Sequence, residues 1–398
     1  MHLLTINTGS SSLKAALYPL AGAERRDLAV HAARIGHDDG TLRIADADGA
    51  TLLDERRDLP DHAAALAATF AWLRDQRPDL RLGAVGHRVV HGGSRYAEPR
   101  FVTGAMVAAL RELIPIDPEH LPQAIAAIEA IGRDHPDVPQ VACFDTAFHR
   151  RMPAVAQTYA LPRRYRDAGV IRYGFHGLSY EYITGALRAE DPRAADGRLV
   201  IAHLGNGASM AAVRGGVGVE TTMGFTPTGG LVMGTRAGDL DPGVLVHLLR
   251  AEKLGPDALS NLLNQESGLL GVSGSSGDMR DLLDRETTDP GAAEAIALFC
   301  YAAKKALGAL AAALGGLDTL VFTGGIGEGA APVRARICEG LEFLGVALDP
   351  HRNAAGAPII SRDGSPATVR VMRTDEELMI ARHTARLIAE QGAPHVSL

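Results

Sequence analysis

The chain has 398 residues, of which 46% are hydrophobic, and a formal net charge of −7 at neutral pH. This length predicts two domains with sizeable cores. The acidic balance excludes an electrostatic case for a nucleic-acid partner.

The cysteines and the apolar segments indicate a cytoplasmic protein with no membrane partner. Cys143, Cys300 and Cys338 lie far apart, without a CxxC pair or metal-site spacing, which fits a reducing compartment. The N-terminus lacks the basic and apolar regions of a signal peptide. Lys304-Lys305 interrupts the most apolar segment, residues 295–317, which is therefore expected to be a buried or subunit-interface helix.

Strand and helix patterns alternate along the whole chain. Strands are predicted at 2–7, 12–18, 82–90, 139–144, 198–204, 208–213 and 318–323. Helices are predicted at 62–75, 104–113, 121–132, 242–252, 292–314, 331–342 and 376–390. This alternation predicts an α/β protein with helices covering sheets.

The first two strands enclose a turn rich in hydroxyls, Thr8-Gly9-Ser10-Ser11-Ser12, between Asn7 and Lys14. Glycine and serine are common in ordinary turns. Such a turn can also bind a phosphate, because its backbone N–H groups and hydroxyls donate and a lysine adds charge. The Walker pattern is absent, so the turn alone leaves both interpretations open.

The segment 199–216, LVIAHLGNGASMAAVRGG, repeats this plan of strand, glycine turn and strand. Aligning Gly9 with Gly205 sets Asn7 against His203. The repeat predicts a duplicated domain with a phosphate-facing hairpin in each copy. Two such hairpins across a cleft could hold the phosphates of a nucleotide.

A third glycine cluster, VFTGGIGEG at 321–329, follows a predicted strand and precedes a predicted helix. This arrangement brings backbone close to a ligand. A dinucleotide site is the competing interpretation. Such a site also needs an acidic residue about 20 positions later, at the end of a second strand, and the sequence has no convincing candidate there. Three glycine loops together favour a phosphorylated ligand.

Motifs along nearly the whole chain resemble those of the acetate and butyrate kinases, in the order of that family. They are NTGSSSLK (7–14), GHRVVHGG (86–93), CFDTAFH (143–149), YGFHGLS (173–179), IAHLGNGASMAAVRGG (201–216), FTPTGGLVMGTRAGDLDPG (225–243), SGSSGDMRDL (273–282), FTGGIGEG (322–329) and TDEELMIAR (374–382).

The resemblance implies an α/β fold of two duplicated ribonuclease-H-like domains of the actin and sugar-kinase type, with the active site in the cleft between them. Residues 1–148 and 376–398 would form the N-terminal domain, and residues 149–375 the C-terminal, nucleotide-binding domain of a homodimer. The implied reaction is ATP + acetate ⇌ ADP + acetyl phosphate by direct in-line transfer. Mg²⁺ would be the metal, with Mn²⁺ able to replace it.

The same resemblance implies roles for individual residues. Asn7 and Glu376 would bind the metal, whereas Asp145, His176 and Arg236 would be catalytic. The acceptor would be bound by Arg88, Val90, Ile116, Phe175 and Pro227. The nucleotide would be bound by Lys14, His203, Leu204, Gly205, Asn206, Gly207, Asp278, Met279, Arg280, Gly325, Ile326, Gly327, Glu328 and Gly329.

Phosphoryl transfer needs positioning and charge neutralisation. Arg88 and Arg236 suit this role, because a guanidinium can bind carboxylate or phosphate oxygens bidentately. A carboxylic acid acceptor is already ionised at neutral pH, so Asp145 is expected to orient metal and acceptor rather than to act as a base. Thr374-Asp375-Glu376-Glu377 has the form of a capping box, which assigns Glu377 to the helix start and leaves Glu376 for the metal. An acid placed near the helix dipole is the structural alternative for Glu376.

Two stretches depart from the family pattern. LIPIDPEHLP (113–122) stands where the family shows Leu-His-Asn-Pro. There we expect Ile116 to wall the acyl site, and Asp117 to replace an imidazole and point away. The family's Gly-Glu-Asn ending is Gly327-Glu328-Gly329 here. The preferences for the acceptor and for the donor nucleotide therefore stay open. The alternative functions also stay open: a propionate or butyrate kinase, a non-catalytic nucleotide-binding regulator, or a dinucleotide-dependent oxidoreductase.

Overall fold

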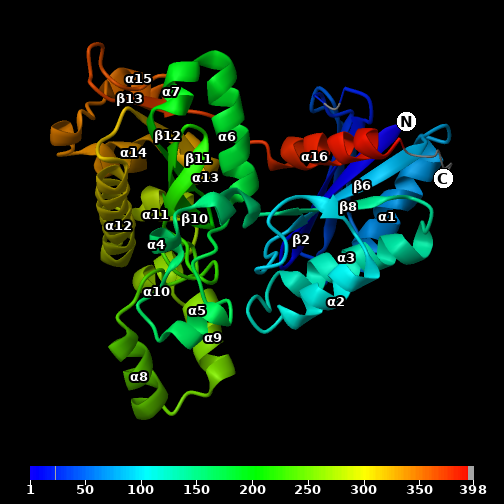
Figure 1. Ribbon diagram of the computed structural model, residues 1–398, viewed down its shortest axis with the longest axis horizontal. Coiled ribbons are helices and arrows are strands. Elements are labelled where there is room, and N and C mark those ends of the chain that lie inside the picture. The colour runs from blue at the N-terminus through cyan, green and yellow to red at the C-terminus, as the bar shows by residue number, and fades with distance from the viewer. Residues whose placement is uncertain (23, 393–398) are drawn as a thin grey trace. The chain divides into compact units, whose positions relative to one another are not determined.

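The computed structural model describes residues 1–22 and 24–392 and divides into two compact units (Figure 1). Unit 1 combines Met1–Ala147 with the C-terminal segment that starts at Asp375, and unit 2 is Phe148–Thr374. Each unit contains one β-sheet that is covered by helices.

The sheet of unit 1 has the strand order β5-β4-β3-β2-β1-β6-β8-β7. Strand β1 pairs antiparallel with β2 and parallel with β6, and β6 pairs parallel with β8. The strands are β1 (His2–Thr8), β2 (Ser12–Pro19), β3 (Leu28–Ala33), β4 (Thr41–Asp46), β5 (Thr51–Arg56), β6 (Leu82–Val89), β7 (Arg100–Phe101) and β8 (Gln140–Phe144).

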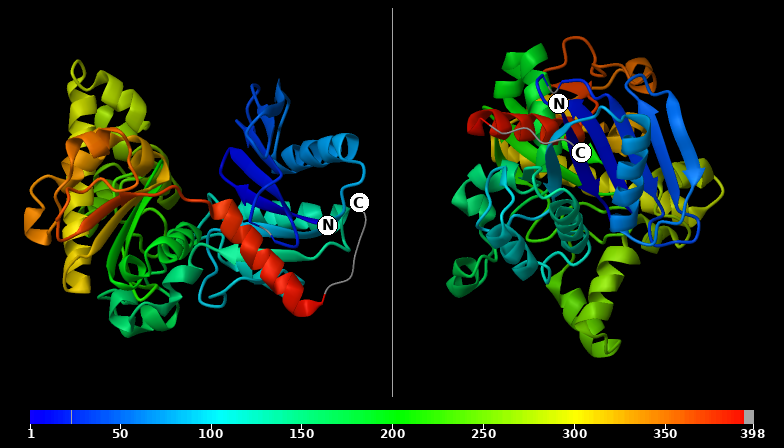
Figure 2. Two further views of the ribbon diagram at one scale, coloured as in Figure 1. Left: turned by 90° about the horizontal axis from the view of Figure 1, so that it is seen from above. Right: turned by 90° about the vertical axis from the view of Figure 1, so that its right-hand side faces the viewer.

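Helices cover both faces of this sheet because its central strands are buried on both sides. Leu4 and Ile6 of β1 share a hydrophobic core with α1 (His62–Gln76) and α3 (Leu121–Asp134). Helix α2 (Gly104–Glu112) packs on α3, and α16 (Glu376–Gln391) packs on β1 and β6. Figure 2 shows α16, in red, running beside the sheet of this unit.

The sheet of unit 2 has the order β11-β10-β9-β12-β13. Its strands are β9 (Arg198–Leu204), β10 (Ala208–Arg214), β11 (Val217–Thr221), β12 (Thr319–Thr323) and β13 (Thr368–Val371). Its helices are η1 (Ala147–Arg151), which straddles the unit boundary, α4 (Ala154–Gln157), α5 (Arg163–Asp167), α6 (Gly177–Glu190), α7 (Pro192–Asp196), α8 (Pro242–Ala251), α9 (Pro256–Gln265), α10 (Gly268–Ser273), α11 (Met279–Arg285), α12 (Pro290–Leu314), α13 (Gly324–Gly329), α14 (Ala331–Cys338), η2 (Glu342–Leu344) and α15 (Pro350–Ala354).

The two sheets share one topology. The run β3-β2-β1-β6-β8 in unit 1 and the run β11-β10-β9-β12-β13 in unit 2 have the same sequence of antiparallel and parallel neighbours. This confirms the duplicated α/β fold predicted from the two similar hairpins. The copies differ in hairpin length by one residue, because Asn7 pairs with Lys14 whereas His203 pairs with Ser209.

Helix α12 is a core helix of unit 2. It is long and apolar enough to span a membrane by length and composition alone. It packs on β9, β10 and β11, and buries Phe299, Leu307 and Leu310. The segment that was predicted to be a buried or interface helix therefore has one face in the core of its own unit.

Two local predictions were wrong. The helix expected over 331–342 ends at Cys338, because Gly340 turns the chain with a left-handed φ of 72°. The predicted capping box, with Thr374 as N-cap, does not form. The N-cap of α16 is Asp375, one residue later, and its side chain accepts from the backbone N–H of Leu378. Thr374 instead directs its hydroxyl to Ser179, so both Glu376 and Glu377 lie in the first helical turn.

Candidate active site

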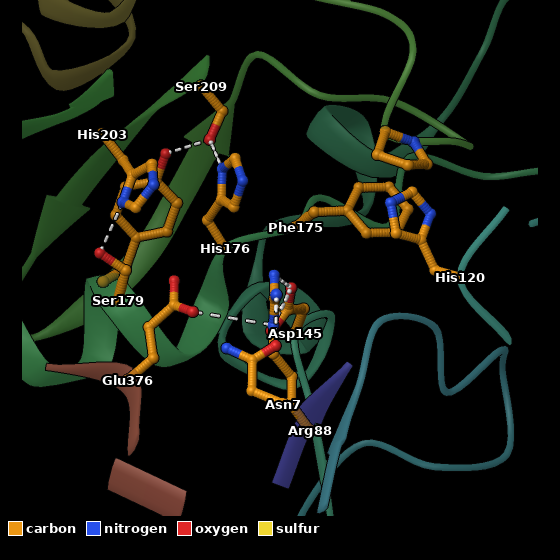
Figure 3. Close-up of polar contacts among 12 residues, drawn as sticks. Asn7, Arg88, His120, Asp145, Phe175, His176, Ser179, His203, Ser209 and Glu376 are labelled. Carbon is orange, nitrogen blue, oxygen red and sulfur yellow. Dashed lines mark hydrogen bonds and ion pairs between the residues drawn. The ribbon is translucent and has the colours of Figure 1, made fainter. Parts of the chain in front are cut away.

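Unit 1 gathers three predicted site residues at the carboxyl ends of adjacent strands. Asn7 lies near the end of β1, Arg88 near the end of β6, and Asp145 directly follows β8. These strands are parallel, so their carboxyl ends meet at one edge of the sheet, where ligands bind in open α/β folds. Helix α16 brings Glu376 to the same group (Figure 3).

Arg88 is the centre of this cluster. Its Nε donates to Asp145 Oδ1 at 3.0 Å, its Nη2 to Asp145 Oδ2 at 2.5 Å, and its Nη1 to Asn7 Oδ1 at 3.1 Å. Asp145 is 1% exposed and Arg88 17% exposed. Burial alone would lower the pKa of Arg88, but the carboxylates of Asp145 and Glu376 raise it above its ordinary value. The guanidinium is therefore a permanent cation.

Glu376 differs from Asp145 in its environment. Its Oε2 lies 3.8 Å from Arg88 Nε, and its side chain is 14% exposed. Burial raises the pKa of Glu376 to about 7, against the opposing effect of Arg88. One cation thus faces two carboxylates, and the second carboxylate ionises near neutral pH. The ionised cluster carries a net negative charge, which favours a bound cation.

The stretch that departs from the family pattern contains an imidazole after all. Asp117 is buried, and its Oδ1 lies 2.8 Å from His120 Nδ1. The carboxylate therefore orients an imidazole that stands three residues later, and the replacement of the family's histidine by Asp117 stays a prediction. Of the predicted acyl-site walls, Val90 is buried and Ile116 half-buried in this unit. Phe175 and Pro227 are buried in unit 2.

In unit 2, the turn of residues 205–207 between β9 and β10 is surrounded by donor groups. A Cβ on Gly207 would lie 2.9 Å from Arg236 Nη2 and 3.2 Å from His176 Nε2, so a larger residue would push these two side chains away from the turn. Arg236 Nη1 donates to the carbonyl of Pro227 at 2.8 Å. The structure thus brings His176, Arg236 and the predicted phosphate turn together.

His176 and His203 form a stacked pair, with ring centroids 4.3 Å apart and planes inclined by 24°. His176 precedes α6 with a left-handed φ of 58°. Its Nδ1 lies 2.9 Å from Ser209 Oγ, and His203 Nδ1 lies 2.8 Å from Ser179 Oγ (Figure 3).

Next to this turn, unit 2 has a cavity of about 590 Å³. This volume lies in the range of small-molecule sites. Its lining comes from the β9–β10 turn, from α11 and the preceding loop, and from α13 and the start of α14. The lining residues are Gly205, Asn206, Gly277, Asp278, Met279, Arg280, Leu283, Gly325, Ile326, Gly329, Ala330 and Pro332.

Several residues predicted to bind nucleotide do not line the cavity. Glu328 Oε1 accepts from the backbone N–H of Gly324 at 2.9 Å and of Thr374 at 3.3 Å, so it holds the glycine segment in place. Leu204 and Gly327 are buried beside this segment. Lys14 lies in unit 1, across the hairpin from Asn7.

The chain matches the acetokinase family over residues 2–382. It belongs to that family. An acetate kinase of Rhodopseudomonas palustris is 50% identical over 393 residues, which cover 97% of this chain and 98% of the relative. An acetate kinase of Rhizobium meliloti is 47% identical, with coverage of 98% and 99%.

Solved structures of family members have the same fold over both units. An acetate kinase of Porphyromonas gingivalis superposes with a TM-score of 0.87 at 37% identity, covering 97% of this chain and 99% of that one. A propionate kinase of Francisella tularensis superposes with a TM-score of 0.90 at 32% identity, with the same coverage. The duplicated fold is thus that of the family.

Some residues of these clusters were missed from the sequence. His120 could have been found, since His120-Leu121-Pro122 keeps the His-x-Pro of the family's Leu-His-Asn-Pro. Ser179 and Ser209 carried no signal, because a buried serine beside a histidine is visible only in three dimensions. Leu283 and Pro332, which line the cavity, resembled ordinary helix residues.

Proposed function

We propose that this protein transfers the γ-phosphoryl group of ATP to acetate, giving ADP and acetyl phosphate, and catalyses the reverse reaction. The observation that carries the proposal is the cluster of Asn7, Arg88, Asp145 and Glu376 at the carboxyl ends of parallel strands, in a chain half identical to an acetate kinase. A non-catalytic regulator would have no need of this charged centre. The cavity of unit 2, which is bordered by the turn of residues 205–207, suits a nucleotide that ends in phosphates and disfavours a nicotinamide enzyme.

The chemistry requires charge neutralisation rather than proton transfer. An acetate oxygen attacks phosphorus, a new O–P bond forms, and the bond to the β–γ bridging oxygen breaks with its electron pair leaving on ADP. Arg88 would bind the acceptor carboxylate, for which it must share its guanidinium with Asp145. Arg236 and His176 would donate to the phosphoryl oxygens at the Gly207 turn.

Magnesium fits the residues of unit 1. Mg²⁺ prefers oxygen ligands and is usually held by one or two carboxylates together with substrate phosphates. Asn7, Asp145 and Glu376 offer amide and carboxylate oxygens beside the guanidinium of Arg88. We propose that Asn7 and Glu376 hold the ion. When bound, Mg²⁺ would neutralise the charge of the phosphates; Mn²⁺ has the same ligand preference.

The cavity of unit 2 would take the nucleoside of the donor. Gly205 and Asn206 line it at the end near the phosphate turn, and Asp278, Met279 and Arg280 contribute from α11. A Cβ on Gly329 would meet no atom within 4 Å. The space that the family's asparagine side chain would occupy in the cavity wall is therefore not filled by another residue. We expect ATP to be accepted, with weaker discrimination among purine nucleotides.

Acetate is the proposed acceptor, and propionate the alternative. The alternative has support from the structural likeness to a propionate kinase. Val90, Ile116, Phe175 and Pro227 include no small residue that would open a long slot. Each added methylene should change kcat/KM by roughly 10–200-fold, so the order acetate, propionate, butyrate is expected.

We also propose a cytoplasmic homodimer. The free, buried thiols of Cys143, Cys300 and Cys338 fit a reducing compartment. Helix α12 leaves Tyr301 61% exposed and Leu298 41% exposed on the face away from the core, which suits a subunit interface. Equilibrium sedimentation would distinguish the dimer from a monomer.

The proposal is tested by incubating the protein with MgATP and each short carboxylic acid, and trapping acyl phosphate as the hydroxamate. Hydroxamate should form with acetate and in smaller amounts with propionate. Release of ADP without any hydroxamate would remove the acyl-kinase proposal. Propionate or butyrate exceeding acetate would instead overturn the acceptor assignment.

A further inference from the structure

We infer that two chains of buried and partly buried hydroxyl groups hold His176 and His203 in the neutral tautomer whose Nε2 carries the hydrogen. Ser179, Ser209, Tyr180 and Thr374 would then be positioning residues that prepare both imidazoles to donate to phosphate oxygens. The chains lie entirely within unit 2.

The first chain runs from Thr374 through Ser179 to His203. Thr374 Oγ1 donates to Ser179 Oγ at 2.9 Å, and Ser179 Oγ lies 2.8 Å from His203 Nδ1. Ser179 is fully buried. A serine hydroxyl has one hydrogen and two lone pairs. Among the described residues Ser179 Oγ has two partners, and because Thr374 donates to it, the imidazole is the acceptor left for its hydrogen. His203 Nδ1 is therefore an acceptor, and the neutral ring carries its hydrogen on Nε2.

The start of this chain is fixed by the glycine segment. The backbone N–H of Thr374 donates to Glu328 Oε1 at 3.3 Å, and the same oxygen accepts from the backbone N–H of Gly324 at 2.9 Å. Thr374 is thereby held in place independently of Ser179. The wall of the nucleotide cavity and the tautomer of His203 are connected through these bonds.

The second chain runs from Tyr180 through Ser209 to His176. Tyr180 and Ser209 share a hydrogen bond between their hydroxyls, and Ser209 Oγ lies 2.9 Å from His176 Nδ1. A phenol is more acidic than an aliphatic hydroxyl, so Tyr180 is the donor of this pair. The hydrogen of Ser209 then points to Nδ1, and His176 also carries its hydrogen on Nε2.

This tautomer suits the position of the rings. Nε2 of His176 faces the Gly207 turn beside the guanidinium of Arg236. Phosphate oxygens accept hydrogen bonds, so a bare Nε2 would repel them, whereas Nε2–H donates. Two stacked imidazolium rings 4.3 Å apart would repel each other. The hydroxyl chains avoid this repulsion, because they provide an Nε2–H donor on a ring that stays neutral. Neutral histidines act as hydrogen-bond donors to substrates in other enzymes as well.

The tautomers can be read directly from long-range ¹H–¹⁵N spectra of the full-length protein labelled at histidine. His203→Gln and His176→Gln assign the two rings by loss of their signals. At pH 8 without nucleotide, both rings should show a protonated Nε2 and an unprotonated, hydrogen-bonded Nδ1. A protonated Nδ1 on either ring, or an imidazolium pattern on both, would overturn the inference.

Removing the serine hydroxyls tests the cause. Ser179→Ala should convert His203 to a mixture of tautomers and leave His176 unchanged, and Ser209→Ala should do the reverse. Tyr180→Phe leaves Ser209 in place and should have the smaller effect on His176. Thr184→Val is the matched control, because Thr184 is a buried hydroxyl on the same helix with no hydrogen-bond partner among the described residues. Unchanged spectra in both serine variants would contradict the proposed chains.

The kinetic consequence depends on the proposed phosphotransfer, whereas the spectra do not. Ser179→Ala and Ser209→Ala should lower kcat by about 10-fold or more, with the KM for MgATP changing much less, as for residues that orient an active imidazole. Ser179→Thr should restore both tautomer and rate. An inactive native protein with the expected spectra would refute the proposed function alone. Full activity in variants with scrambled tautomers would refute the positioning role.

Discussion

The side chains of the proposed site are held by their neighbours before any ligand binds. Arg88 is fixed by three hydrogen bonds to Asp145 and one to Asn7, and Asp117 holds His120. Such support keeps rotamers fixed and reduces the reorganisation needed during reaction. This arrangement costs folding free energy where like charges are buried together, as the carboxylates of Glu376 and Asp145 are.

Glu376→Gln should raise stability and abolish activity. Burial raises the pKa of Glu376 to about 7, so ionisation destabilises the folded state above neutral pH. The native protein binds an extra proton between the unfolded pKa and 7, and stability therefore falls as the pH rises through this range. At pH 8 the variant should be about 3 kcal/mol more stable by urea unfolding, with the difference vanishing only below the unfolded pKa, near pH 4. Equal stability at pH 8 would contradict the buried carboxylate.

Arg236→Ala should reduce kcat by about 10³ or more while changing the KM for acetate less, as at positions where an arginine neutralises a transferred phosphoryl group. Arg236→Lys should recover only a part, since an ammonium cannot bind two oxygens in one plane. Arg133→Ala, which removes an exposed arginine that pairs with its neighbour Asp134, serves as the control. Near-normal kcat in Arg236→Ala would reduce its role to the bond with the Pro227 carbonyl.

Asp117→Asn gives a residue-scale test of the acceptor stretch. Because Asp117 faces His120 rather than solvent, removing its charge should lower kcat/KM for acetate by weakening the orientation of that ring. A large gain in acetate affinity would show instead that the carboxylate faces the acceptor. Steady-state kinetics with acetate at fixed MgATP separates the two results.

At the scale of elements, helix α16 lies unusually close to the sheet of unit 1. A Cβ on Gly86 of β6 would lie 2.3 Å from Thr384 Oγ1 and 2.6 Å from Ile380 Cγ2. Glycine therefore sets the depth at which the helix packs. The N-terminus of that helix presents Glu376, so its position affects the charged cluster.

Gly86→Ala should destabilise unit 1 by about 1–3 kcal/mol through overpacking, and should lower activity by displacing α16. Gly185→Ala is the matched control, because Gly185 lies inside α6 with nothing within 4 Å of a Cβ. That control should gain about 0.5–1 kcal/mol. The melting temperatures of both variants test this prediction. A higher melting temperature for Gly86→Ala would mean that α16 can move away from β6 without loss of stability.

Most elements around the site were predictable because their patterns are local. Apolar periodicity identified β1, β2, β6, β8, β9, β10 and β12, and the glycine clusters marked the turns between them. The strands β3, β4 and β5 were not predicted, since each has six residues and its alternation of apolar and polar residues is therefore short. Such strands depend on the neighbours with which they pair more than on their own residues.

The site was predictable where a residue follows a strand and was not where it depends on packing. Asn7, Arg88 and Asp145 come at the ends of buried strands, so parallel pairing brings them together. The capping box failed because Thr374 has a better partner in Ser179, 195 positions away. The imidazole of His120 was overlooked because the motif was matched at Asp117, and only the hydrogen bond between them shows their relation.

At the scale of the molecule, buried neutral histidines limit the tolerance of acid. Burial lowers the pKa of His87 and His149 to about 4, although each makes one hydrogen bond. The unfolded chain binds these protons near pH 6.5, so stability should fall as the pH drops from 6.5 toward 4. Each histidine should contribute about 2–3 kcal/mol to this loss.

Urea unfolding between pH 7 and pH 4.5 measures this slope. His87→Leu should flatten it, because the variant no longer has a proton acceptor at that position. A variant with the native slope would mean that carboxylates alone cause the acid sensitivity. The comparison uses slopes, so a change of stability at pH 7 does not affect it.

The central claim is that a carboxylate oxygen of acetate forms the new bond to the phosphorus that leaves ATP. It is tested most directly by ³¹P spectra of the reaction of MgATP with acetate labelled with ¹⁸O in both oxygens. The account predicts an acetyl phosphate signal displaced by one bridging ¹⁸O, in step with the loss of ATP. ADP with inorganic phosphate that lacks ¹⁸O, and without any acetyl phosphate, would contradict it.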